Sequence, residues 1–302
     1  MRRYSTDEEA RAYFERMRWP NGPVCPHCGS SDKIYARKAN AKTGTRAGLY
    51  KCGECSDTFR VTVGTVMESS KVPLHKWLIA FYMMCASKTQ VSALQLQRQL
   101  ELGSYRTALF LCHRIRFALK DAGPSGLLSG EVEADETYIG GKARGKGRGY
   151  TGNKVAVVSL VQRGGEVRST VVDRANGKVI DTLLKRHVSE DAHLNTDESP
   201  LYNKAGKRHA SHARVNHSIE EYGYYDYRTG RNVTTNTVEG FFGNAKRSLD
   251  GTHHHVSRQH LDLYAAEIDF KYNTRASTDG ERTSEGIRRI EGKRLMYRPK
   301  GS

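Results

Sequence analysis

Apolar residues recur along the chain with two different spacings, which divide the sequence into successive segments. Residues 1–20 have the spacing of a short helix, and Thr6 followed by three acidic residues marks its start. The segment that ends at residue 70 shows instead the alternation of β-branched residues that is typical of strands. From residue 73 the spacing becomes helical and predicts three consecutive helices, over residues 73–88, 92–102 and 104–123.

The second half of the chain mixes strand and helix patterns. Residues 131–141 alternate like a strand, and residues 154–173 have the pattern of two strands joined by a glycine turn. An amphipathic helix over 179–191 and a short strand over 192–199 follow. The order strand, strand, strand, helix, strand is that of an RNase-H-like α/β domain, which we therefore expect here.

The composition of the chain indicates which kind of molecule it binds. The 302-residue chain is long enough for two or three small domains, but only 37% of its residues are hydrophobic. Its formal net charge is +16, which favours nucleic acid as the partner because neutralised phosphates release counterions. An anionic membrane surface is the competing interpretation. The sequence has no run of about 18 apolar residues and no signal-peptide core, so we expect a soluble, cytoplasmic protein without membrane attachment.

Four of the six cysteines form two pairs with the spacing of a metal site. Cys25 and Cys28 enclose Pro-His, Cys52 and Cys55 enclose Gly-Glu, and 23 residues separate the pairs. In a cytosolic chain, two such knuckles are typical of a zinc ribbon, in which four thiolates surround one tetrahedral Zn²⁺. Disulfides or redox motifs are the alternative. The spacing therefore predicts that residues 21–70 fold around zinc.

The second and third predicted helices are joined by a tight turn, as in a helix-turn-helix. At about 100° per residue, four polar residues of the third helix share one side next to its apolar stripe. These residues are Arg106, His113, Arg116 and Lys120. Because the chain is strongly basic, we expect this side to contact DNA. The alternative is the solvated face of a small helical bundle.

Three carboxylates are distributed over the ends of strands and a helix in the α/β segment. Asp135 lies in the first strand, Asp197 lies at the end of the short fourth strand, and Glu239 lies on a helix predicted over 235–249. Three such carboxylates suit two Mg²⁺ or Mn²⁺ ions, because hard divalent cations prefer oxygen ligands. One ion would activate a water or a 3′-hydroxyl, and the other would stabilise the leaving oxygen.

Several short motifs of the sequence occur together in one group of proteins. They are CPHCG, CGEC, VEADETYIGGK, VNHSIEEY, NTVEGFFGNAKR, GTHHHVSRQHLDLY and DFKYNTR. With them the chain resembles the zinc-ribbon-bearing insertion-sequence transposases of the DDE superfamily, the group with an ISXO-type catalytic domain. The resemblance implies DNA transposition by cleavage at terminal inverted repeats and strand transfer to a target. It carries Asp135, Asp197 and Glu239 over as metal-binding catalytic residues, and Lys246 as a residue that holds substrate DNA.

Two of these assignments have competitors in the sequence. Members of the group use either asparagine or glutamate as the third catalytic residue, and Asn236 lies one turn before Glu239. A carboxylate brings charge to a dication and an amide does not, which favours Glu239. Glu198 adjoins Asp197, but adjacent side chains of a strand point to opposite faces, so only one of these two can serve.

We therefore expect an RNase-H-like catalytic domain preceded by a zinc ribbon and a helix-turn-helix-like domain. It would act on double-stranded DNA, both transposon ends and target, as a homo-oligomer at a prokaryotic nucleoid. The expected parts are an N-terminal helix (1–20), the zinc ribbon (21–70), the helix-turn-helix-like DNA-binding domain (71–123), the DDE catalytic domain (131–275) and a basic C-terminal tail (276–302). Residues 286–302 of this tail are expected to be poorly ordered. Two other classes stay open: a DNA-binding regulator with a domesticated catalytic domain, and an RNase-H-like structure-selective nuclease such as a junction resolvase.

Overall fold

The chain divides into two compact units, each with its own core. Unit 1 contains Met1–Asp121 together with Ser277–Ser302, and unit 2 contains Ala122–Ala276. The computed structural model describes residues 5–43, 45–120, 126–140 and 154–296. Across these residues, none of the helices combines the length and the apolar content that a membrane crossing requires.

The ribbon follows the first helix of unit 1. Helix α1 (Asp7–Arg18) begins at the predicted cap, where Thr6 and Glu9 form a reciprocal capping box. Three short antiparallel strands follow in the order β1-β2-β3, namely β1 (Ile34–Arg37), β2 (Leu49–Cys52) and β3 (Thr58–Phe59). The strand pattern was predicted to continue past β3, but that segment forms turns. Its backbone makes hydrogen bonds between residues three apart, such as Thr65 N–H to the Thr62 carbonyl and Glu68 N–H to the Thr65 carbonyl, and these close turns instead of pairing with a strand.

The three helices predicted after the ribbon are confirmed. They are α2 (Leu74–Ala86), α3 (Ala93–Gln99) and α4 (Tyr105–Leu119). Ser92 and Ser104 cap α3 and α4, because each hydroxyl accepts a hydrogen bond from a backbone N–H in the first turn.

The exposed basic side predicted for α4 is wrong for two of its four residues. Arg106 and Lys120, at the two ends of the helix, are exposed, whereas His113 is buried and Arg116 is only 1% exposed. The reason is that α4 lies in the middle of unit 1, where neighbouring segments cover nearly all of its last three turns. The buried Arg116 guanidinium donates to the backbone carbonyl of Val91 at 3.5 Å, a partner within unit 1.

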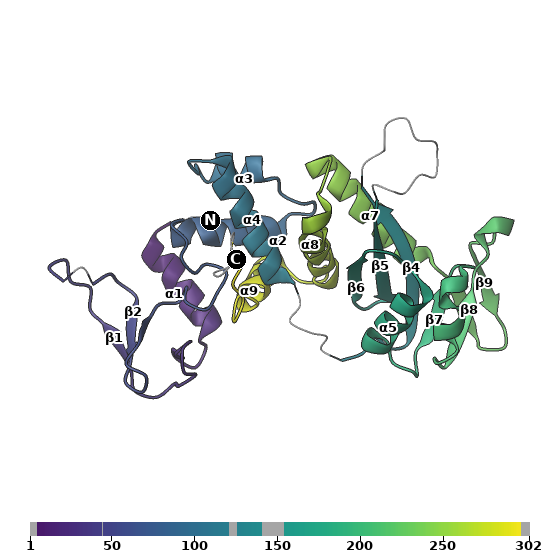
Figure 1. Cartoon of the computed structure of the whole chain (residues 1–302), viewed down its shortest axis with the longest axis horizontal. Helices are drawn as coiled ribbons and strands as arrows, with labels where there is room; N and C mark the ends of the chain where they lie inside the picture. Colours follow the sequence, from purple (N-terminus) through teal and green to yellow (C-terminus); the bar gives the residue numbers. More distant parts are fainter. Residues whose placement is uncertain (1–4, 44, 121–125, 141–153, 297–302) are drawn as a thin grey trace. The chain divides into compact units, whose positions relative to one another are not determined.

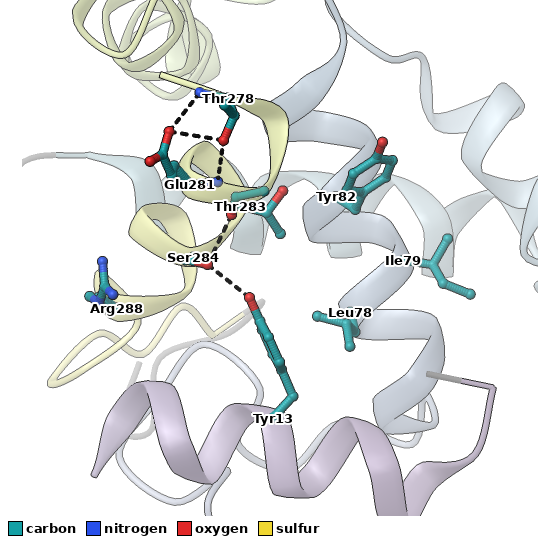
Figure 2. A pocket seen from close by; sticks show the side chains of 10 residues that line it. Tyr13, Leu78, Ile79, Tyr82, Thr278, Glu281, Thr283, Ser284 and Arg288 are labelled. Atoms are coloured by element: carbon teal, nitrogen blue, oxygen red, sulfur yellow. Dashed lines mark hydrogen bonds between the residues drawn. The ribbon is translucent and has the colours of Figure 1, made fainter. Parts of the chain in front are cut away.

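Residues 286–296 of the C-terminal tail are not poorly ordered as their basic composition predicted, and residues 297–302 lie outside the described residues. Helix α9 (Asp279–Arg288) begins with a second capping box and packs in unit 1 beside α1 and α2. The Tyr13 hydroxyl of α1 lies 2.8 Å from Ser284 Oγ of α9 (Figure 2). Ile287 and Ile290 are fully buried. Two isoleucines among many polar residues are a weak sequence signal for an ordered helix. In the folded unit 1, however, their burial against neighbouring elements anchors the segment.

Unit 2 is built on a mixed five-stranded sheet in the order β6-β5-β4-β7-β8 (Figure 1). The strands are β4 (Glu131–Ile139), β5 (Val155–Gln162), β6 (Val167–Val172), β7 (His193–Thr196) and β8 (Ser211–Arg214). The first three form an antiparallel meander, whereas β7 runs parallel to β4 and β8 parallel to β7. This order and these directions are consistent with the predicted RNase-H-like fold.

Helices cover both faces of this sheet. On one face, α5 (Gly177–His187) packs over a core that includes Val132 and Ala134 of β4. On the other, α7 (Asn236–His253) and α8 (Leu261–Asn273) pack over the alternate residues, so Glu133 and Asp135 point toward these helices. The shorter elements are η2 (Pro200–Tyr202), α6 (Asn203–Gly206), η3 (His217–Ile219), η4 (Arg258–His260) and a separate hairpin of β9 (Gly223–Asp226) and β10 (Arg231–Thr234).

Candidate active site

The parallel pairing of β4 with β7 brings the first two predicted carboxylates together. Glu133 lies opposite Asn195, and the same register continued by two residues places Asp135 opposite Asp197 at the carboxyl end of β7. β4 and β7 are far apart in the sequence and become adjacent through the crossover that contains α5. The proximity of Asp135 and Asp197 therefore depends on the order of the strands in the sheet.

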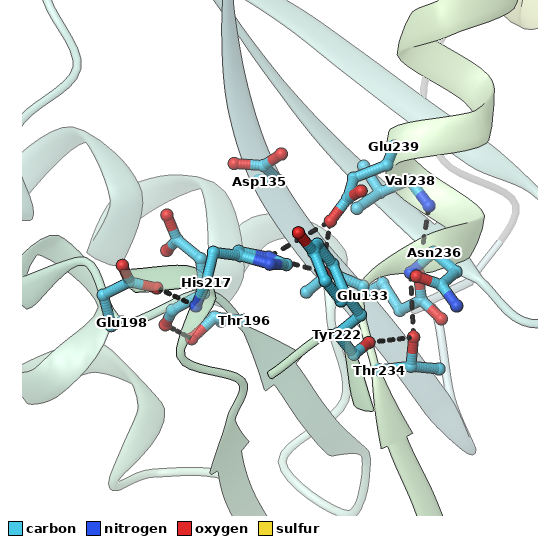
Figure 3. A network of polar contacts seen from close by, with 12 residues as sticks. Glu133, Asp135, Thr196, Glu198, His217, Tyr222, Thr234, Asn236, Val238 and Glu239 are labelled. Atoms are coloured by element: carbon cyan, nitrogen blue, oxygen red, sulfur yellow. Dashed lines mark hydrogen bonds and ion pairs between the residues drawn. The ribbon is translucent and has the colours of Figure 1, made fainter. Parts of the chain in front are cut away.

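Glu239 approaches this pair from the first turns of α7. Figure 3 shows its carboxylate on the side of the helix that faces Asp135 and His217, while Asn236 lies on the other side of the helix start. Glu239 Oε1 accepts a hydrogen bond of 2.7 Å from the Thr235 hydroxyl and lies 3.2 Å from His217 Nε2. Of the two candidates for the third ligand, Glu239 is therefore the one beside the acid pair.

The negative charges at the site add to the effect of burial on the pKa values of Asp135 and Asp197. Burial, and next the negative charge of Asp197, raise the pKa of Asp135 to about 7, and Glu239 adds to the shift. Burial is also the main cause that raises the pKa of Asp197, with a further contribution from Glu239. Within the described residues, Asp135 has no cationic side chain as a partner. Two acids whose charged forms are destabilised by burial and by neighbouring negative charge fit a divalent cation, which would reverse these shifts.

The structure separates Asp197 from its competitor Glu198. The two carboxylate oxygens of Glu198 accept hydrogen bonds from Ser218 Oγ at 2.7 Å and from the His217 backbone N–H at 3.0 Å. These bonds hold the pKa of Glu198 well below its ordinary value. Because Glu198 is engaged in holding residues 217–218, Asp197 is the acid left to face Asp135.

Glu133 holds the start of α7, a role that its sequence position did not suggest. Its fully buried carboxylate accepts hydrogen bonds from the backbone N–H groups of Thr237 (2.8 Å) and Val238 (2.9 Å), and from the Thr237 hydroxyl (2.9 Å). Arg163, which follows β5, donates to the same carboxylate at 2.7 Å and to two backbone carbonyls of β10. Glu239 directly follows Val238, so this anchor also fixes its position. The sequence did contain one indication that Glu133 lies near the site. It is two residues from Asp135, and this spacing puts both acids on one face of β4.

His217 is a second residue that sequence reasoning left without a role at the site. Its Nε2 lies 3.2 Å from Glu239 Oε1 and 3.3 Å from Thr235 Oγ1 (Figure 3). Its backbone N–H donates to Glu198, and this hydrogen bond holds the segment after β8 so that the imidazole lies next to α7. His217 therefore helps to orient the Glu239 carboxylate.

Lys246 lies on the exposed side of α7, about two turns beyond Glu239. Across the part of unit 2 that the structure describes, it has no acidic partner, whereas its neighbour Arg247 is hydrogen-bonded to Asn244 at 2.6 Å. The Lys246 ammonium is thus available to an anion from outside the chain.

The four paired cysteines meet in the ribbon of unit 1. Cys25 Sγ lies 3.7 Å from Cys55 Sγ, Cys28 Sγ lies 3.7 Å from Cys52 Sγ, and all four sulfurs lie within 4.8 Å of one another without a disulfide. Sulfurs bound at about 2.3 Å to a tetrahedral ion are themselves about 3.8 Å apart, so the spacing fits zinc. Within the described residues, the four cysteines are the one group of metal-ligating side chains whose ligand atoms lie this close together, and Asp135, Asp197 and Glu239 do not form such a group. The cysteines thus form a possible zinc-binding site.

The cysteine cluster and the acid-bearing mixed sheet define the class, a zinc-ribbon protein with an α/β domain consistent with the RNase-H-like fold. Comparison with known families makes this class more specific. Residues 127–273 match the ISXO2-like transposase domain, and residues 5–58 match the transposase zinc-ribbon domain. The two matches confirm the resemblance to zinc-ribbon-bearing insertion-sequence transposases that was drawn from the sequence.

A curated relative has the same overall extent. It is an uncharacterized protein in transposable element ISH50 of Halobacterium salinarum (strain ATCC 700922 / JCM 11081 / NRC-1), 29% identical over 278 residues that cover 86% of this chain and 89% of the relative. Among solved structures, the simian T-cell lymphotropic virus intasome in complex with the PP2A regulatory subunit B56 gamma aligns with 14% identity over 75% of this chain and 76% of that chain. The TM-score of that alignment is 0.32, which does not establish a common fold.

Proposed function

We propose that the chain is a DNA transposase that binds the terminal inverted repeats of its element and catalyses strand cleavage and strand transfer at Asp135, Asp197 and Glu239. The observation that carries the proposal is the convergence of two carboxylates from neighbouring parallel strands with a third from a helix anchored to the same sheet. The match of residues 127–273 to a transposase domain supports the choice of substrate.

The acidic residues fit a pair of Mg²⁺ or Mn²⁺ ions, because they combine oxygen ligands with mutual repulsion that divalent cations would remove. Bound ions would supply Lewis-acid activation of the attacking water or 3′-hydroxyl and stabilisation of the leaving oxygen. Asp135 and Asp197 would hold the ions from the sheet, and Glu239 would hold them from α7. Glu133 and His217 would keep the Glu239 carboxylate directed at the site.

DNA recognition is assigned to residues outside the acidic centre. We infer that Lys246 holds a phosphate of the cleaved strand, because it is exposed along the helix that bears Glu239. The ribbon, with Zn²⁺ on its four cysteines, and the helix-turn-helix-like segment 71–123 would recognise the transposon ends. Of the four residues first assigned to that segment's DNA-binding side, Arg106 and Lys120 keep the exposure that the role requires. The active form would be a homo-oligomer on DNA, at the nucleoid.

A plasmid assay tests this function. Supercoiled DNA that carries the element's own ends is incubated with full-length protein and Mg²⁺, and cleavage and strand-transfer products are separated by size. Asp135→Asn and Glu239→Gln keep side-chain size but remove charge, so each should lower cleavage by several orders of magnitude while DNA binding persists. Asn236→Ala should lose less, and Glu190→Gln, an exposed acid away from the site, should behave as the unmodified protein.

Three results would contradict the proposal. Normal cleavage by Glu239→Gln together with an inactive Asn236→Ala would assign the third ligand to the asparagine. Equal cleavage of plasmids with and without the ends would indicate a structure-selective nuclease. End-specific binding without any metal-dependent cleavage would indicate a DNA-binding regulator.

A further inference from the structure

The surface beside the active site is rich in exposed aromatic rings. Of the twelve large hydrophobic side chains that are exposed in the described parts of the chain, five lie within residues 219–227. Four are tyrosines, Tyr222, Tyr224, Tyr225 and Tyr227, with Tyr227 89% exposed. Rings this exposed do not serve a core.

The pleat of the β9–β10 hairpin gives its two faces different surroundings. Tyr224 is paired with Val233, and both line a polar pocket over β7 and β8. Tyr225 alternates to the other face, where its ring meets that of Tyr227 edge-on with 4.9 Å between centroids. The outer face of the hairpin therefore presents two tyrosine rings in contact with each other and with solvent.

The root of the hairpin is fixed to the catalytic residues. The Tyr222 ring lies 5.7 Å from the ring of His217, which contacts Glu239. The end of β10 leads directly into Thr235, whose hydroxyl donates to Glu239, and Arg163 holds the carbonyls of β10. These contacts keep the hairpin in one position beside the acidic centre.

The tyrosine pair lies close to this root. Tyr225 lies opposite Asn232, two residues before the end of β10 at Thr234. Two residues of a strand span about 7 Å, so Tyr225 is near the end of the hairpin that adjoins Thr235. A DNA strand held at Glu239 would thus pass the rings within a few nucleotides.

We propose that Tyr225 and Tyr227 stack on unpaired bases of the DNA strand next to the cleavage site. The inference rests on the proposed function, because DNA bound at Glu239 is what brings bases to the hairpin. Aromatic rings bind unpaired bases through their π faces without regard to sequence. The Arg228 side chain is exposed next to Tyr227 and adds a positive charge for the phosphate backbone. The Asp226 carboxylate, in contrast, is used by the turn, since it accepts hydrogen bonds from the Arg228 N–H and the Thr229 hydroxyl.

Binding measurements on the full-length protein test the stacking. One probe is a duplex with an oligothymidylate tail that contains a single 2-aminopurine, whose fluorescence falls on stacking, and the other is a blunt duplex. Ca²⁺ replaces Mg²⁺ so that the strands stay intact. Replacing both tyrosines by alanine should weaken binding of the tailed probe about fivefold or more, since each stacked base is held by a ring, and should abolish the quenching. Affinity for the blunt duplex should not change.

Two further variants separate ring stacking from a change in folding. Tyr225→Phe combined with Tyr227→Phe keeps both rings and should retain tail affinity and quenching. Tyr138→Ala removes an exposed tyrosine of β4, outside the hairpin, and should leave tail affinity unchanged.

Several outcomes would overturn the proposal. They are unchanged tail affinity in the double alanine variant, equal loss on both probes, and a change of oligomeric state in light scattering without loss of tail affinity, which would mean a protein partner. The proposed function is tested separately by Asp135→Asn, which should stop plasmid cleavage but keep tail binding and quenching. Tyrosine-dependent quenching in a protein whose cleavage survives Asp135→Asn would refute the assigned catalytic centre and leave the stacking surface standing.

Discussion

Replacing Glu133 by glutamine should loosen the attachment of α7 to the sheet. The Glu133 carboxylate is surrounded by four donors, two backbone N–H groups of α7, the Thr237 hydroxyl and Arg163 Nε. A glutamine keeps the size of the side chain, but its amide nitrogen is a hydrogen-bond donor. This nitrogen would replace an acceptor oxygen and face two of the donors, with which it cannot form hydrogen bonds. At least two of the four hydrogen bonds are therefore lost in Glu133→Gln.

The magnitude follows from burial. Each buried donor left without an acceptor costs about 1–3 kcal/mol, so two such donors lower the free energy of unfolding of unit 2 by about 2–6 kcal/mol. This loss is smaller than the total stability of many domains, about 5–15 kcal/mol, so the variant should still fold. The freed helix start also displaces Glu239, and a misplacement of about 1 Å at a reacting centre lowers rates roughly 100-fold.

Thermal unfolding and Mg²⁺-dependent plasmid cleavage measure these two effects. The matched control is Glu136→Gln on the same strand, because Glu136 accepts a single side-chain hydrogen bond, from the Tyr202 hydroxyl at 2.7 Å, which a glutamine oxygen can also accept. Glu133→Gln should unfold at a clearly lower temperature than this control and cleave far more slowly at equal DNA binding. If the two variants were equally stable and equally active, Glu133 would not anchor α7 in the way described.

Three further predictions concern the ribbon, the DNA contact and the C-terminal helix. Metal analysis should find about one zinc per chain, which Cys52→Ser should lose because three sulfurs cannot complete the tetrahedron, while Cys85→Ala, in the helical core, should retain it. Lys246→Ala should reduce productive DNA binding and lower the salt dependence of binding by about one phosphate contact, as measured by titration at several salt concentrations. Arg247→Ala, whose side chain is already bonded to Asn244, should have a smaller effect. Ile287→Ala should lower the free energy of unfolding of unit 1 by about 2–4 kcal/mol, seen as earlier thermal unfolding, because this fully buried side chain joins α9 to the rest of the unit. Unchanged stability in that variant would mean that α9 is not part of the core.

Local sequence pattern predicted the order of strands and helices, because the period of apolar residues depends only on the geometry of each element. The ribbon cysteines were predictable for the same reason, since each CxxC pair is a local turn that directs two sulfurs to one point. The candidate acids Asp135 and Asp197 were predictable once the order of elements indicated an RNase-H-like sheet, which makes their strands neighbours.

Tertiary packing decided the features that depend on surfaces far apart in the sequence. Arg116 was expected to face DNA because of its charge, but neighbouring segments cover α4, and no pattern within one helix reveals that. Glu133 caps α7 from a strand about a hundred residues earlier, a hydrogen-bond arrangement that exists only when β4 and α7 meet. The sequence determines which chemical groups each residue offers. The burial of a residue and its hydrogen-bond partners are determined by the packed fold, because each contact involves two elements.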